Sequence, residues 1–118
     1  MDQKRFYLYH GLVTSVYDGD TCTIDIDLGF KTHIKSEKIR LSRINAPEIR
    51  GSERESGLKS RDYLRSLINK KEIVLETVKD KKGKYGRYIG EIWLKLDDEW
   101  VNINDLMVSR GYAEYKEY

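Results

Sequence analysis

Cys22 is the only cysteine in this sequence of 118 residues, so the chain can form no intramolecular disulfide. A cysteine-based zinc site would also lack its other ligands. We expect Cys22 to be a core or half-buried strand residue. The chain has only two histidines, His10 and His33, which are too far apart to indicate a histidine metal centre. Each lies in a strand-like segment, and we assign both to structure.

Long apolar runs are missing as well, and the longest are far too short to cross a bilayer. The first five residues are not followed by the apolar core of a signal peptide. We therefore expect no membrane partner and a cytoplasmic location, although a leader that had already been removed would be invisible. Apolar residues make up 39% and charged residues 36%, which suits a single folded domain over residues 1–118, expected to be a monomer.

Net charge is also small, at +2, but the charges are unevenly distributed. Residues 1–90 contain 19 Lys/Arg and 13 Asp/Glu, whereas residues 91–118 contain 3 and 7. The first three-quarters of the chain could therefore face a polyanion. The densest basic cluster, residues 79–87, is punctuated by glycine and contains a tyrosine. By itself, such a run is more often a solvated loop than a phosphate site.

Hydrophobic patterning predicts five strands and two helices. Strict alternation over Thr23–Leu28 places Ile24, Ile26 and Leu28 toward a core and the intervening aspartates toward water. Ser52 and Glu55 form a capping-box pattern before a helical stripe of Leu58, Leu64, Leu67 and Ile68. We expect strands at about 5–16, 23–28, 38–44, 72–78 and 88–96, and helices at 52–69 and from 102 or 104 to about 110.

This order of elements predicts an α+β protein with a β-barrel core. It fits a five-stranded Greek-key barrel of the OB type, with one helix between the third and fourth strands and another at the C-terminal end. Loops of such barrels commonly bind oligonucleotides. The fold alone does not establish a function, because OB barrels support many.

Three short segments contain residues suited to chemistry: Asp-Gly-Asp-Thr at 18–21, Ile-Arg-Leu-Ser-Arg-Ile-Asn-Ala-Pro-Glu at 39–48, and Lys-Tyr-Gly-Arg at 84–87. Carboxylate oxygens ligate calcium or magnesium, and an arginine fork can hold phosphate oxygens. The segments therefore suit a hard cation beside a phosphate. None is specific alone, because Asp-Gly is also a common hairpin turn. An EF-hand is excluded, since Cys22 stands where an oxygen ligand belongs.

The arginines and the glutamate of the middle segment have alternative explanations. Arg40 and Arg43 lie three apart on the expected third strand, on opposite faces. Arg40 either faces a cluster of carboxylates or extends to solvent, and Arg43 holds another phosphate or pairs with a surface carboxylate. Glu48 follows Pro47, which stiffens the backbone. It is either an exposed loop residue or a base that activates water near a cation.

Together these blocks resemble the staphylococcal (micrococcal) nuclease family. The family pattern has an Asp-Gly-Asp-Thr turn, an Arg-Leu strand leading to Pro-Glu, a Lys-Tyr-Gly-Arg block and a terminal helix that closes with Gly-Leu/Tyr-Ala. This chain has all four in order, the last from residue 104 to Ala113. The resemblance spans about residues 12–115 and implies calcium-dependent hydrolysis of DNA and RNA with little sequence preference.

For the metal, the resemblance implies that Asp20 is a ligand, Asn45 occupies the second ligand position and the carbonyl of Ala46 is a third. One Ca²⁺ ion, or another divalent metal in its place, would be bound. The family usually has aspartate where this chain has Asn45. Because the number of charged ligands is a main determinant of calcium affinity, we expect weaker calcium binding here.

For catalysis, the resemblance implies that Arg40 and Arg87 bind the scissile phosphate and that Glu48 activates or positions water. Lys84 and Tyr85 would contact the nucleotide, Tyr85 by packing on the sugar or base. We therefore predict an endonuclease acting on DNA or RNA, with single strands favoured.

The main alternative is an inert nucleic-acid-binding or protein-interaction module of the same family. A metal-sensing or purely structural module is a third reading, but it explains neither Arg87 nor the basic loop.

Overall fold

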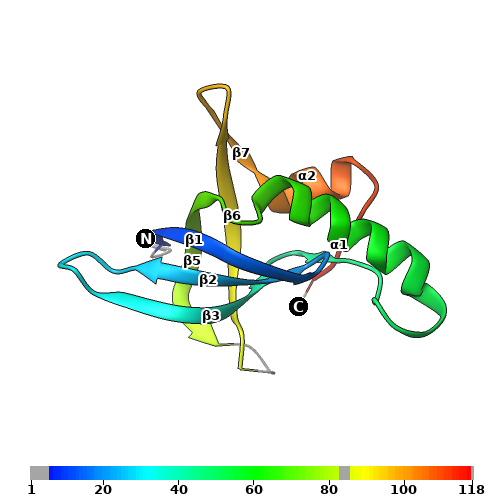
Figure 1. The fold of residues 1–118 in the computed structure, drawn as a ribbon, viewed down its shortest axis with the longest axis horizontal. Helices are drawn as coiled ribbons and strands as arrows, with labels where there is room; N and C mark the ends of the chain where they lie inside the picture. The colour runs from blue at the N-terminus through cyan, green and yellow to red at the C-terminus, as the bar shows by residue number, and fades with distance from the viewer. Residues whose placement is uncertain (1–5, 83–85, 118) are drawn as a thin grey trace.

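The computed structural model describes residues 6–82 and 86–117, which form a curved sheet and two α-helices (Figure 1). In chain order the elements are β1 Phe6–Asp18, β2 Thr21–Asp27, β3 His33–Leu41, β4 Ile44–Asn45, the 3₁₀ turn η1 Gly51–Glu53, α1 Arg54–Ile68, β5 Glu72–Lys82, β6 Tyr88–Leu96, β7 Glu99–Asn102, α2 Ile103–Ser109 and β8 Glu114–Tyr115.

The main sheet closes on itself. Strand β1 pairs antiparallel with β2 and with β5, β2 pairs with β3, and β5 pairs with β6. A parallel pairing between β3 and β6 completes the ring. In the described part of the chain, the predicted α+β fold is therefore confirmed. Five strands are bonded in a ring, β7 adds a sixth strand beside β6, and α1 lies between the third and fourth strands of the ring.

The barrel interior is filled by the apolar positions of the strands and covered by α1. Ile24 and Ile26 are buried as the alternation predicted, as are Leu64 and Ile68 of the helix. Leu28 is an exception, because it is 38% exposed. It lies beyond the end of β2, in the hairpin that points away from α1 (Figure 1), where the barrel no longer covers it.

The third strand is shorter at its C-terminal end than predicted. It ends at Leu41, and Arg43 adopts a left-handed backbone conformation with φ of 69°. The left-handed conformation of this residue turns the chain just after β3 has ended. Ile44 and Asn45 then form the separate strand β4, which pairs with β8. Arg40 and Arg43 therefore do not share a strand, contrary to the prediction.

The predicted capping box is also wrong. Helix α1 begins at Arg54 after the 3₁₀ turn, and Glu53 is its N-cap residue, without a side-chain capping bond. Helix α2 agrees with the earlier of its two predicted starts. Its N-cap is Asn102, whose side chain accepts a hydrogen bond from the Asp105 backbone N–H at 2.9 Å.

Cys22 is fully buried in the core, as expected, and burial raises the pKa of its thiol to about 12. The thiol is therefore protonated and unreactive at neutral pH. His10 and His33 are exposed strand residues. No helix among the described residues is both long and apolar enough to span a bilayer.

Candidate active site

A cleft of about 860 Å³ opens where the β1–β2 turn, β3, α1 and the segment after β4 meet. Its walls contain three acidic and five basic side chains together with smaller polar and apolar groups. The lining residues are Ser15, Val16, Tyr17, Asp18, Asp20, Thr21, Thr23, Lys38, Arg40, Ala46, Glu48, Ile49, Arg61, Arg65 and Arg87. The cleft thus brings Asp20, Arg40, Ala46, Glu48 and Arg87 together from three separate sequence motifs.

Two glycines allow the backbone segments of this cleft to approach closely. A Cβ atom on Gly19 would lie 2.7 Å from the Cβ of Ala46 and 2.8 Å from the Cβ of Ser60. A Cβ atom on Gly57 would lie 2.0 Å from the carbonyl oxygen of Glu48. All three distances are shorter than van der Waals contact. The β1–β2 turn and the Glu48 backbone are therefore packed directly against α1.

Asp20 is held by hydrogen bonds on both carboxylate oxygens. Its Oδ2 accepts from the backbone N–H of Ala46 at 2.8 Å and lies 3.4 Å from Nη2 of Arg40, while Oδ1 accepts from Thr21 Oγ1 at 3.2 Å. Asp20 is 6% exposed and Arg40 is 9% exposed, so the ion pair is buried. Arg40 also donates from Nη1 to the Leu41 carbonyl at 2.8 Å. Of its two alternatives, Arg40 therefore faces the carboxylate.

Asp18 is a second carboxylate at this turn, to which the sequence motif assigned no role. Its Oδ1 accepts from the Asp20 backbone N–H at 3.0 Å. Burial, and after it the charge of Asp20, raise the pKa of Asp18 from 3.8 to about 7. In the sequence, the two aspartates on either side of Gly19 were the signal that could have indicated a role for Asp18. Its burial, however, is visible only in the fold.

The chemistry of these donors fits a divalent cation. The two carboxylates disfavour each other's charge, and a cation bound at the turn would remove that repulsion. In the described residues, no group of three or more His, Cys, Asp or Glu side chains is placed around one metal position. Backbone, carboxamide and water oxygens would have to complete the coordination, which calcium accepts readily.

Asn45 lies beside this turn but outside the lining of the cleft. Its side chain is exposed, and Oδ1 accepts from Nη2 of Arg40 at 3.4 Å. Its backbone is paired with Glu114 of β8. The carboxamide is therefore close to the Arg40–Asp20 pair, but it is less enclosed than either.

Arg87, just before β6, lines the same cleft. Its Nη1 donates to Thr21 Oγ1 at 3.3 Å, and Thr21 in turn donates to Asp20. Glu48 is exposed on the wall, and its carboxylate accepts no hydrogen bond from another described residue. Lys84 and Tyr85, the expected nucleotide contacts, lie outside the described residues.

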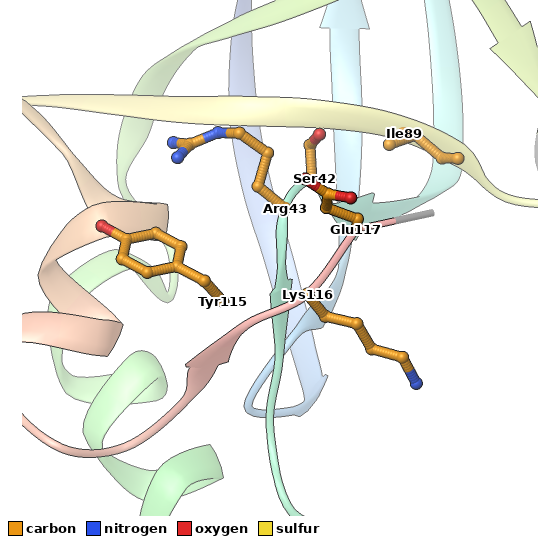
Figure 2. A pocket seen from close by; sticks show the side chains of 6 residues that line it. All are labelled: Ser42, Arg43, Ile89, Tyr115, Lys116 and Glu117. Carbon is orange, nitrogen blue, oxygen red and sulfur yellow. The ribbon is translucent and has the colours of Figure 1, made fainter.

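Arg43 does not contribute to this cleft. Its guanidinium donates from Nε and Nη2 to Glu91, at 3.0 and 2.6 Å, and from Nη2 to Asp105 at 2.9 Å. The structure thus favours the carboxylate-pairing alternative for this residue. Figure 2 shows Arg43 and Tyr115 at a second pocket of about 550 Å³, lined by Ser42, Arg43, Ile89, Tyr115, Lys116 and Glu117, which shares no residue with the cleft.

With this geometry in place, comparisons with known proteins identify the family. Residues 38–118 match the model of the staphylococcal nuclease homologue family, so the chain belongs to that family. It is 29% identical over 110 residues to a thermonuclease of Staphylococcus intermedius, covering 91% of this chain and 60% of the relative. It is 26% identical over 120 residues to an uncharacterized protein of Methanocaldococcus jannaschii, covering 89% of this chain and 58% of the relative. The chain thus spans less than two thirds of either relative's length.

Proposed function

We propose that this chain is a calcium-dependent endonuclease that hydrolyses phosphodiester bonds in DNA, RNA or both, with little sequence preference. The observation that carries the proposal is the convergence of Arg40, Glu48 and Arg87 on the cleft that also holds the Asp18–Asp20 pair. Membership of a nuclease family supports it. An inert module would have no need for two arginines and a glutamate beside a cation-binding turn.

Asp20, with Asn45 and the carbonyl of Ala46, would hold the cation, and Asp18 would add negative charge beside them. When bound, the cation would polarise a phosphate oxygen and the attacking water. The hydrogen bonds from Ala46 and Thr21 fix the orientation of Asp20 in advance. Such preorganisation avoids the cost of reordering the site during the reaction.

Glu48 would accept the proton of the attacking water, because its carboxylate lies on the cleft wall without a competing partner among the described residues. Arg40 and Arg87 would bind the nonbridging oxygens of the phosphate and stabilise the charge that develops as water adds. Each well-placed donor of this kind contributes about 3 kcal/mol to transition-state stabilisation. Arg40 is suited to this role because the Leu41 carbonyl restricts its guanidinium.

The decisive experiment is cleavage of single-stranded DNA and RNA by the purified protein, with calcium or with a chelator. We expect cleavage that requires calcium and falls at least about 100-fold in Glu48→Gln and in Arg87→Ala. Glu55→Gln and Arg110→Ala are matched controls, because both residues are exposed and outside the cleft. Calcium-dependent cleavage that survives in Glu48→Gln would contradict the role of that residue. Binding of nucleic acid without cleavage under any divalent metal would establish the inert module instead.

A further inference from the structure

The cleft is also lined by basic and aromatic residues that the proposed chemistry does not use. Arg61 and Arg65 line it from α1, and Tyr17 lines it from β1. The two arginines are four residues apart on one helix, so their side chains are neighbours on the same face. They add two guanidiniums from α1 to the basic lining that Arg40 and Arg87 supply.

The guanidinium of Arg65 is anchored in place. Its Nη2 donates to the Val16 carbonyl at 3.0 Å, which joins α1 to β1 beside the cleft. A guanidinium has five N–H donors, so this single bond leaves others for a ligand. Among the described residues, no carboxylate is within ion-pair distance of Arg65. Its positive charge is therefore not neutralised locally.

Arg61 has a partner that an incoming anion could replace. Its Nε and Nη2 both donate to Asp62 Oδ1 at 3.1 Å. The Asp62 side chain is 63% exposed, whereas that of Arg61 is 24% exposed. An ion pair with so exposed a carboxylate contributes little free energy, so exchanging Asp62 for a phosphate costs little. Arg61 is thus a covered guanidinium at the cleft with a weak local partner.

Tyr17 places an aromatic ring beside these arginines. It is 54% exposed, and its hydroxyl accepts a hydrogen bond from Arg50 Nη2 at 3.4 Å. Single-stranded nucleic acids bind where a basic groove follows the backbone and an aromatic face receives a base. Arg61, Arg65 and Tyr17 together supply both elements.

We propose that Arg61, Arg65 and Tyr17 form a second nucleotide subsite, which binds a phosphate that is not cleaved and stacks its base on Tyr17. This inference rests on the proposed function, because it takes the scissile phosphate to lie at Arg40 and Arg87. Its consequence is a preference for polynucleotides over dinucleotides and small phosphodiesters. The ligand class is single-stranded nucleic acid, read through its backbone and base faces without sequence specificity.

Binding measured in the Glu48→Gln background, with calcium present, tests the subsite without cleavage. Fluorescently labelled single strands of two and eight nucleotides are titrated, and the ratio of their dissociation constants is compared between variants. We expect Arg61→Gln with Arg65→Gln to weaken binding of the eight-nucleotide strand about 10-fold or more and to weaken dinucleotide binding much less. The slope of log affinity against log salt changes by about 0.7 for each phosphate neutralised on a single strand, so loss of this one phosphate contact should reduce that slope by about 0.7.

Three further variants separate the subsite from general effects. Lys59→Ala removes an exposed charge from α1 outside the cleft. It should leave unchanged the ratio of the dissociation constants for the two strand lengths, called the length ratio below. Arg61→Gln alone loses only an exposed ion pair, so it tests the subsite even if loss of the Arg65–Val16 bond impairs folding. Tyr17→Leu should weaken binding of the eight-nucleotide strand about 5-fold or more, because it removes the stacking surface.

An unchanged length ratio in both Arg61→Gln and the double variant would overturn the subsite. A different measurement tests the proposed function. That function would be contradicted if the unmodified chain hydrolysed no phosphodiester in the presence of calcium. In that case the length ratio still decides whether Arg61 and Arg65 bind nucleic acid.

Discussion

Arg43 donates two hydrogen bonds to the carboxylate of Glu91, from Nη2 at 2.6 Å and from Nε at 3.0 Å. Its Nη2 also reaches Asp105, which accepts a hydrogen bond from the Tyr115 hydroxyl at 2.9 Å. One arginine in the turn between β3 and β4 thus connects β6, α2 and β8. Arg43 directly precedes β4, so this network anchors the start of the segment that carries Asn45 and Ala46.

Arg43→Ala should destabilise the fold by about 1–2 kcal/mol. A bidentate ion pair that links several elements contributes more to the free energy of unfolding than an isolated surface pair does. Arg43→Lys should recover only part of the loss, since an ammonium cannot form the two parallel bonds. Urea denaturation gives the free energy of unfolding for each variant. Equal stability of the original chain and Arg43→Ala would show that the network is energetically neutral.

Asn45→Asp should tighten calcium binding about 10-fold, because it adds a negative charge beside Asp20 without a large change in shape. Isothermal titration calorimetry with calcium chloride measures the change. Thr32→Asp adds the same charge in the hairpin that points away from α1, and should leave the affinity unchanged (Figure 1). If the two substitutions had equal effects, general charge rather than ligation would explain them.

Asp18 gives the metal-free protein a dependence of stability on pH. Its pKa of about 7 in the fold exceeds the ordinary value of 3.8, so the folded state holds this proton more tightly than the unfolded state does. The associated stability is present below about pH 4 and is lost as the pH rises through 7. Asp18→Asn should therefore be more stable than the original chain at pH 8 in chelator, by about 1–2 kcal/mol, and close to it at pH 4.

Urea denaturation of both chains at the two pH values tests this expectation for Asp18. With calcium at pH 8, the original chain should instead be more stable than Asp18→Asn. The cation stabilises the ionised carboxylate of Asp18, and the asparagine variant lacks that negative charge. A difference in stability that did not vary with pH would show that folding leaves the pKa of Asp18 unchanged.

Gly57→Ala should destabilise the fold by about 1–3 kcal/mol, although alanine is the better helix former. The reason is the 2.0 Å approach that the new Cβ would make to the Glu48 carbonyl. Ser56→Ala, one position earlier and exposed, should be neutral or stabilising. Thermal denaturation compares the two, and cleavage assays should show lower activity for Gly57→Ala because Glu48 is displaced. A stabilised Gly57→Ala would mean that the backbone relaxes freely there.

Much of the fold could be predicted from local patterns. Alternation identified the buried isoleucines of β2, and helical spacing identified Leu64 and Ile68, because burial on one face leaves a periodic signal. The break at Arg43 could not be predicted, since nothing in an arginine indicates a positive φ. The strands β4 and β8 have two residues each, too few for any periodicity, and they exist only because distant segments meet.

The lining of the candidate site could be predicted to the extent that it follows from motifs, whereas the roles of its residues stay predictions. Asp20, Arg40, Glu48 and Arg87 line one cleft, as their motif positions implied, whereas the raised pKa of Asp18 depends on burial that sequence spacing cannot reveal. Arg61 and Arg65 resemble ordinary solvated helix arginines in the sequence. Only the packing of α1 against β1 places them at the cleft.

The pairing of β3 with β6 has a consequence for the order of folding. It places Arg40 opposite Ile89, about 50 residues later in the chain, and β4 pairs Asn45 with Glu114, about 70 residues later. Contacts between such distant positions close large loops and form late. During synthesis, the emerging polypeptide would therefore complete its β1–β2–β3 meander well before β6 and β8 could pair with β3 and β4 beside the cleft.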